Sequence, residues 1–281
     1  MFTALRIARA AMALAAGLMI AVAAASAEDT RRTALVGVTP EGMTCLIGGS
    51  MRGIIADAEA VASRLQHKDP YTLIRMDETR GEVVSVGKPE PMDDGGDCES
   101  SYVQDLTFTD DQLGLFQVAL SGKPDEVRAK LPKNFLRLPV KDDDHMKIVA
   151  EVLTEAGLVN PKIDIKQLLA ADLDGDGRQE TIINAIHTKR DNETRGEYSL
   201  LLLRRETAGK QEVIEIKKQI SLEDKDEPSL LVEHTVVSLM DMDNDGAAEL
   251  VLYGAFAFGE GWEVVKIKGK TAEQALFCGC G

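Results

Sequence analysis

The spacing of apolar residues changes near residue 160 of this 281-residue chain. Before that point, apolar residues at three-four spacing predict helices over 53–66 and 142–156. After it, short apolar runs separated by polar loops predict strands, with no helix to the end. We therefore expect an α+β, mainly β protein. Residues 28–160 would form an N-terminal α+β domain, and residues 161–281 a β-rich unit.

Shorter patterns predict strands within the N-terminal region. Apolar runs broken by glycines over 34–49 indicate one or two strands. A turn at 78–81 separates the strand-like runs 71–76 and 82–86, which therefore predict a hairpin. Further strands are expected over 101–109 and 115–120.

The C-terminal region contains an internal repeat, which we place at 161–229 and 230–281. Each copy has the order strand, acidic loop, strand, loop, strand, strand. The two acidic loops share the pattern D-x-D-x-D-G-x-x-E and begin at Asp172 and at Asp241, 69 residues apart. A repeat of this size predicts sheets that pack against each other.

The spacing of oxygen ligands in these loops is typical of a site for a hard cation. Alternating carboxylates at positions one, three and five precede a glycine that permits a sharp turn, and a backbone carbonyl and an acid follow at positions seven and nine. Without a cation, the carboxylates would repel one another. We expect two calcium ions, bound by Asp172, Asp174, Asp176, the Arg178 carbonyl and Glu180, and by Asp241, Asp243, Asp245, the Ala247 carbonyl and Glu249.

An EF-hand shares the first half of this pattern, but it requires a glutamate at position twelve and a helix on each side. Position twelve is Ile183 in the first loop and Leu252 in the second, and the predicted flanks are strands. The segments 171–182 and 240–251 instead resemble the FG-GAP repeats of integrin alpha subunits and the VCBS repeats of bacterial exported proteins. The resemblance covers about residues 163–281.

This resemblance implies propeller blades in which calcium is a structural staple. A closed propeller needs at least four blades, whereas two copies are detectable here. We therefore expect two blade-like sheets that pack on each other and on the N-terminal domain, not a closed propeller.

The first 27 residues have the features of a signal peptide. Arg6 and Arg9 precede an apolar run of 16 residues, 10–25, which ends at an Ala25-Ser-Ala27 cleavage signal. The run is shorter than the roughly 20 residues that span a membrane. We expect cleavage, a periplasmic or secreted location and no later membrane span. Loss of these two arginines would take the formal charge from −15 to −17, which argues against nucleic acid and anionic membranes as partners.

Export would make the four cysteines candidates for disulfides. Three connectivities are possible, and the sequence does not choose between them. The pairing that we prefer joins Cys45 to Cys98 and closes Cys278 and Cys280 into a small ring.

No catalytic constellation is recognisable. His67, His145, His187 and His234 are scattered, lack zinc-site spacing and are expected at the surface. The sequence therefore favours an exported, non-catalytic, calcium-binding β-repeat protein. The alternative is a binding module for an envelope protein or glycan, with contacts at 189–197 and 256–262. A hydrolase is less favoured.

Overall fold

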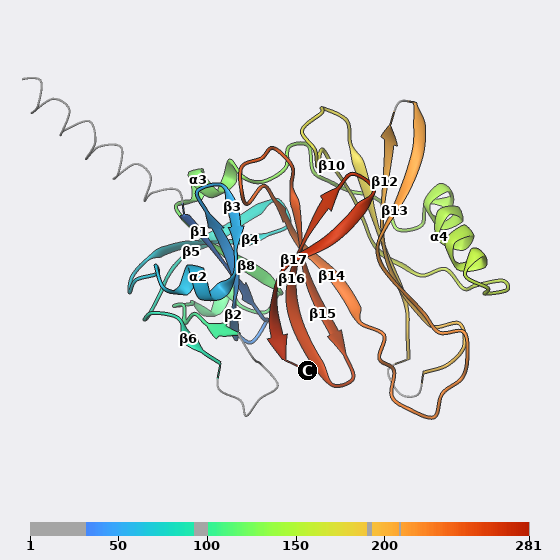
Figure 1. Ribbon diagram of the computed structural model, residues 1–281, viewed down its shortest axis with the longest axis horizontal. Coiled ribbons are helices and arrows are strands. Elements are labelled where there is room, and N and C mark those ends of the chain that lie inside the picture. Colours follow the sequence, from blue (N-terminus) through green and yellow to red (C-terminus); the bar gives the residue numbers. More distant parts are fainter. Residues whose placement is uncertain (1–31, 93–100, 190–192, 208, 281) are drawn as a thin grey trace, which may run out of the picture.

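The computed structural model describes residues 32–92, 101–189, 193–207 and 209–280. Three large antiparallel sheets lie side by side, as Figure 1 shows. Half of the structure is strand and 11% is helix, so the expectation of a mainly β protein is confirmed. No helix among the described residues is long and apolar enough to cross a membrane. The predicted signal peptide lies outside the described residues.

The first sheet has six strands in the order β3-β2-β1-β8-β4-β5. The strands are β1 (Arg32–Val38), β2 (Thr44–Met51), β3 (Ile54–Ala56), β4 (Pro70–Arg75), β5 (Glu78–Val84) and β8 (Gln117–Ser121). The predicted hairpin is therefore present as β4 and β5. Helix α2 (Ala58–Ala62) covers one face of the sheet through Ala58 and Val61. The small elements β6 (Glu90–Pro91), β7 (Tyr102–Val103), η1 (Asp110–Gln112) and α3 (Pro124–Arg128) lie in the connections.

The helix predicted over 53–66 is mostly wrong. Arg52 and Gly53 adopt positive φ angles of 55° and 77° and reverse the chain, so that β3 pairs antiparallel with β2. The helix begins only after Asp57, whose carboxylate accepts a hydrogen bond from the Ala60 N–H at 2.8 Å. The apolar spacing had merged a short strand with the one-turn helix that follows it.

The second and third sheets, which we call the repeat sheets, draw all their strands except β9 from the two segments predicted as repeats. Strands β10 (Ile165–Ala171), β11 (Glu180–His187), β12 (Tyr198–Thr207) and β13 (Lys210–Ile220) form one meander, with β9 (Leu136–Arg137) beside β10. Strands β14 (Glu233–Met240), β15 (Glu249–Phe256), β16 (Gly259–Lys268) and β17 (Thr271–Cys280) form the other. The pairs Ala171–Glu180 and Met240–Glu249 close the two acidic loops in the same register.

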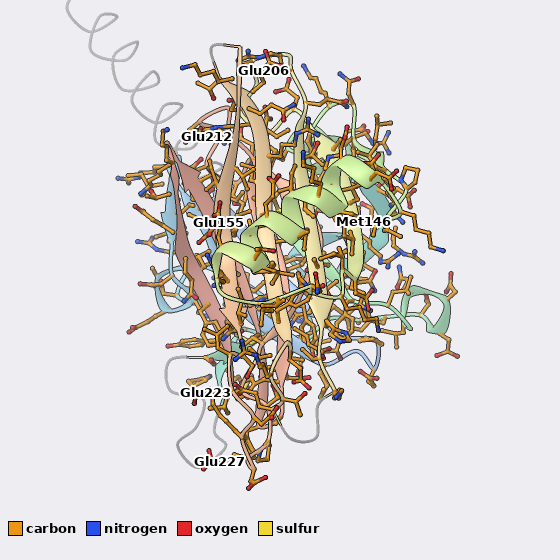
Figure 2. The ribbon with its side chains drawn as sticks, turned by 90° about the vertical axis from the view of Figure 1, so that its right-hand side faces the viewer. Met146, Glu155, Glu206, Glu212, Glu223 and Glu227 are labelled. Carbon is orange, nitrogen blue, oxygen red and sulfur yellow. A yellow bond between two sulfur atoms is a disulfide. The ribbon has the colours of Figure 1, made fainter. Side chains whose placement is uncertain are left out.

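The β14–β17 sheet is the central layer. One apolar core, which includes Val237, Val251 and Val264, joins it to the six-stranded sheet. A second core, which includes Leu250, Leu252 and Val265, joins it to the β9–β13 sheet. The far face of the β9–β13 sheet is covered by the predicted helix, α4 (Asp143–Glu155), through Val149 and Leu153. Figure 2 shows α4 crossing this face from Met146 to Glu155. The division at residue 160 stays a prediction.

A disulfide joins Cys45 on β2 to Cys278 on β17. The preferred pairings of Cys45 with Cys98 and of Cys278 with Cys280 are therefore wrong. The partners are 233 residues apart in sequence and meet because their sheets pack face to face. Cys98 lies outside the described residues.

Candidate metal centre

The two acidic loops have the same backbone conformation. Position four, Gly175 or Asn244, has a φ angle of 74° or 59°, and position six, Gly177 or Gly246, has a φ angle of 87° or 93°. These left-handed residues turn the carboxylates of positions one and three toward each other. The shared local sequence therefore produces a shared loop.

Position two of each loop is an apolar anchor. Leu173 is buried in the core between the two repeat sheets, and Met242 is buried in the core between the β14–β17 sheet and the six-stranded sheet. The Leu173 N–H donates to Glu180 Oε2, and the Met242 N–H donates to Glu249 Oε2, both at 2.8 Å. The glutamate at position nine thus ties each loop to a different core.

Three carboxylates converge in each loop, and each group could hold a metal ion. The groups are Asp172, Asp174 and Glu180, and Asp241, Asp243 and Glu249, with one oxygen from each residue within 4.8 Å of the others. Asp176 and Asp245, which we also expected as ligands, lie outside these groups. Ligation by the Arg178 and Ala247 carbonyls stays a prediction.

The carboxylates of the first loop are neutralised little by positive charges of the protein. The Arg178 guanidinium engages Asp176 Oδ2, with Nε–Oδ2 and Nη2–Oδ2 distances of 2.9 and 2.5 Å, and its hydrogen bonds lower the pKa of Asp176. Among the described residues, no basic side chain pairs with the converging carboxylates. Asp172 Oδ1 is buried without a hydrogen-bond partner. Burial, followed by the charges of the neighbouring aspartates, raises the pKa of Glu180.

The second loop contains a cation of its own. The ammonium of Lys266, on β16, lies 2.7 Å from Asp243 Oδ2, 2.6 Å from Asp245 Oδ2 and 3.2 Å from Glu249 Oε1. The last contact is an ion pair without hydrogen-bond geometry. Although burial opposes it, these carboxylates raise the pKa of Lys266.

A second lysine contacts the backbone of the same loop. Lys130 Nζ donates to the Met242 carbonyl at 3.2 Å and to Asn244 Oδ1 at 2.9 Å. Burial lowers the pKa of Lys130, although the loop carboxylates oppose the shift. The Lys130 carbonyl accepts from the Asp241 N–H at 2.8 Å. The second loop is therefore held by two lysines from outside its own sequence.

Neither lysine is among the ligands or contacts expected from the sequence. Lys266 had a usable signal, because a tight hairpin that pairs Leu250 with Val265 places Glu249 opposite Lys266. In the first repeat, Thr181 pairs with Arg204, and continuing this register by one residue would place Arg205 opposite Glu180. Arg205 instead contacts Glu212 Oε2 at 2.8 Å. The two hairpins therefore present their basic residues differently.

The two loops touch each other. The Ala248 N–H donates to the Leu173 carbonyl at 2.7 Å, and a Cβ placed on Gly175 would lie 3.1 Å from the Gly246 carbonyl oxygen. An ion in the first loop would therefore act on the contact between the repeat sheets.

The opposite end of this sheet interface holds a buried polar cluster. His234 Nε2 lies 2.9 Å from Glu263 Oε1, and Lys217 Nζ, from the facing sheet, lies 2.5 Å from Glu263 Oε2. The expectation of surface histidines is therefore wrong for His234, as it is for His145, which is buried against the second sheet beside Asp142 and Arg204.

A cavity of about 770 Å³ opens at the same end of the interface, with Phe116, Phe256, Glu260 and His234 among its walls. It adjoins a second cavity of about 490 Å³, and the two share His234, Phe256 and Glu260. The segment 256–262, predicted as a contact surface, therefore borders a concave surface in part.

Comparisons with protein-family models, with curated proteins and with solved structures return no match for this chain.

Proposed function

We propose that this is an exported, non-catalytic, calcium-binding β-repeat protein in which a cation held by the first acidic loop fixes the contact between the repeat sheets. The observation that supports it most directly is the group Asp172, Asp174 and Glu180, with a buried oxygen of Asp172 that lacks a donor. An all-oxygen set suits calcium, which takes six to eight such ligands in a variable geometry, better than magnesium, which demands near-ideal octahedral geometry.

Two further features support this function. The loop anchor Leu173 lies in the core between the repeat sheets, so cation binding there would stabilise the folded state over the unfolded chain. A disulfide between Cys45 and Cys278 suits an oxidising, extracytoplasmic compartment. The FG-GAP or VCBS relationship and the signal peptide remain part of the proposal.

Thermal or urea unfolding in calcium and in EGTA tests this function. Calcium at 100 times its dissociation constant should stabilise the protein by about 2.7 kcal/mol per site. A double Asp174→Ala, Asp243→Ala variant should lose the response, whereas Asp226→Ala, in an exposed loop, should keep it. If calcium does not change the stability of the wild type, the proposal is wrong.

A second candidate function is ligand binding in the cavity beside β15 and β16. Its walls include Phe116, Phe256 and Glu260, and aromatic faces beside carboxylates are suited to a glycan or a partner side chain. Trp262 is the single tryptophan and lies 5.2 Å from Tyr253 of the cavity wall, centroid to centroid. Titration with oligosaccharides should change its fluorescence in the wild type but not in Phe256→Ala; no change in either would count against this function.

A further inference from the structure

The second acidic loop differs from the first in what stands at the centre of its carboxylates. Lys266 Nζ contacts Asp243, Asp245 and Glu249 at 2.6–3.2 Å. The ammonium donates hydrogen bonds to Asp243 and Asp245, and its contact with Glu249 is an ion pair, so one positive charge faces three carboxylates. Its side chain is 15% exposed and that of Glu249 is fully buried, so this charge is screened little by solvent.

We propose that Lys266 is a built-in substitute for the metal ion in the second loop, so that the protein binds one calcium ion, at the first loop, and not two. This inference rests on the proposed calcium function. Val265, the neighbour of Lys266 on β16, pairs with Leu250, so the strand holds the ammonium beside Glu249, and a tethered cation competes at high effective concentration with an ion from solution. Calcium would have to displace the ammonium before it reached Asp243 and Glu249.

Within the described part of the chain, the first loop has no equivalent group. Its register counterpart, Arg205, contacts Glu212 and the Gly269 carbonyl, each at 2.8 Å. Arg178 engages Asp176 at the rim and not the converging oxygens of Asp172, Asp174 and Glu180. The same loop pattern therefore receives its positive charge from a lysine of the protein in the second copy, whereas the first copy requires a cation from solution.

The ligand geometry remains in place beneath Lys266. Asp243 Oδ1 and Glu249 Oε1 are buried and accept no hydrogen bond, and the Asp241, Asp243 and Glu249 oxygens converge as closely as those of the first loop. Removing the ammonium should therefore expose a second calcium site.

Calorimetric titration of calcium into chelator-treated protein measures the number of ions bound. We expect one ion on the wild type, two on Lys266→Met and one on the control Lys268→Met, whose exposed ammonium pairs with Glu273 on the same hairpin. Asp174→Ala should abolish binding in the wild-type background, and Asp243→Ala should leave both stoichiometry and affinity unchanged. These two aspartate variants decide the matter even if Lys266→Met does not fold.

The possible failures are distinguishable. Two ions on the wild type, or a single ion that is lost in Asp243→Ala and kept in Asp174→Ala, overturn the inference while calcium binding stands. A folded Lys266→Met that still binds one ion also overturns it. No binding by either protein overturns the proposed function as well.

Discussion

The two acidic loops share their sequence pattern, their backbone conformation and their strand register, yet they differ in how their charge is balanced. In the second loop, Lys266 lies among the carboxylates and Lys130 binds the backbone. In the first, the guanidinium of Arg178 is engaged with the rim residue Asp176. A duplicated motif therefore need not have a duplicated function, because the counter-charge comes from neighbouring strands and not from the motif.

The surroundings of the loops differ as well. The second loop faces the six-stranded sheet, where Ser50 Oγ donates to the Met242 carbonyl at 2.8 Å and the Cys45–Cys278 disulfide crosses the same core. The first loop packs against the second repeat, where the Leu173 carbonyl accepts from Ala248. The second loop thus packs on a core that a disulfide crosses, whereas the first loop packs on the β14–β17 sheet through the contact of Leu173 with Ala248.

The largest expected effect comes from removing the covalent link. A Cys45→Ser, Cys278→Ser variant frees a loop of 233 residues in the unfolded chain, and the chain-entropy model puts the loss of stability at about 5.5 kcal/mol. Denaturant unfolding followed by the fluorescence of Trp262, which lies in the same core, measures it. Reducing the wild type should have the same effect on stability. A loss below about 1 kcal/mol would show that sheet packing, not the disulfide, holds the second loop against the first sheet.

The next largest effect concerns Lys266. In EGTA, Lys266→Met leaves the buried Glu249 beside Asp243 without a cation, and we expect a loss of about 3 kcal/mol. Calcium should restore most of it, and adding Glu249→Gln should restore stability without calcium by removing the uncompensated charge. The measurement is denaturant unfolding of the three proteins with and without calcium. Wild-type stability of Lys266→Met in EGTA would contradict the internal-cation account.

A smaller effect separates the two ends of the sheet interface. Although burial alone would raise the pKa of Glu263, hydrogen bonds from His234 and Lys217 lower it. Because the folded pKa lies below the ordinary value of 4.5, this stabilisation is complete above that value and is lost as the pH falls through the lowered pKa. Glu263→Gln should cost about 2 kcal/mol at neutral pH.

The difference between Glu263→Gln and the wild type should shrink below pH 4.5 and should be independent of calcium. Unfolding curves from pH 6 to pH 3, recorded with and without calcium, check both expectations. A calcium-dependent difference would mean that the acidic loops at one end of the interface and Glu263 at the other are energetically coupled.

Local sequence patterns correctly predicted the features that depend on residues close together in the chain. The strands that flank Asp172 and Asp241, the helix over Asp143–Glu155 and the mainly β class all follow from periodicity and turn residues. Contacts between distant segments did not follow. Lys266 meets Asp243 because a hairpin folds back, Cys45 meets Cys278 because two sheets stack, and His234 is buried because the β9–β13 sheet covers it.

The smallest expected effect tests the first loop from its rim. Arg178 is exposed and pairs with Asp176, and an exposed pair of this kind contributes little to stability. Arg178→Ala keeps the backbone carbonyl, which is the predicted ligand, and removes a positive charge beside the carboxylates. Calcium should therefore bind up to about fivefold more tightly at low salt, and the gain should fade as salt screens the rim. Calorimetry at two ionic strengths measures this change. Lys268→Met, which also removes one positive charge but leaves Arg178 in place, is the control. Weaker calcium binding by Arg178→Ala would mean that the guanidinium positions Asp176 as a ligand. The first loop would then also depend on a cation from the protein, and the two loops would be more alike than their geometry indicates.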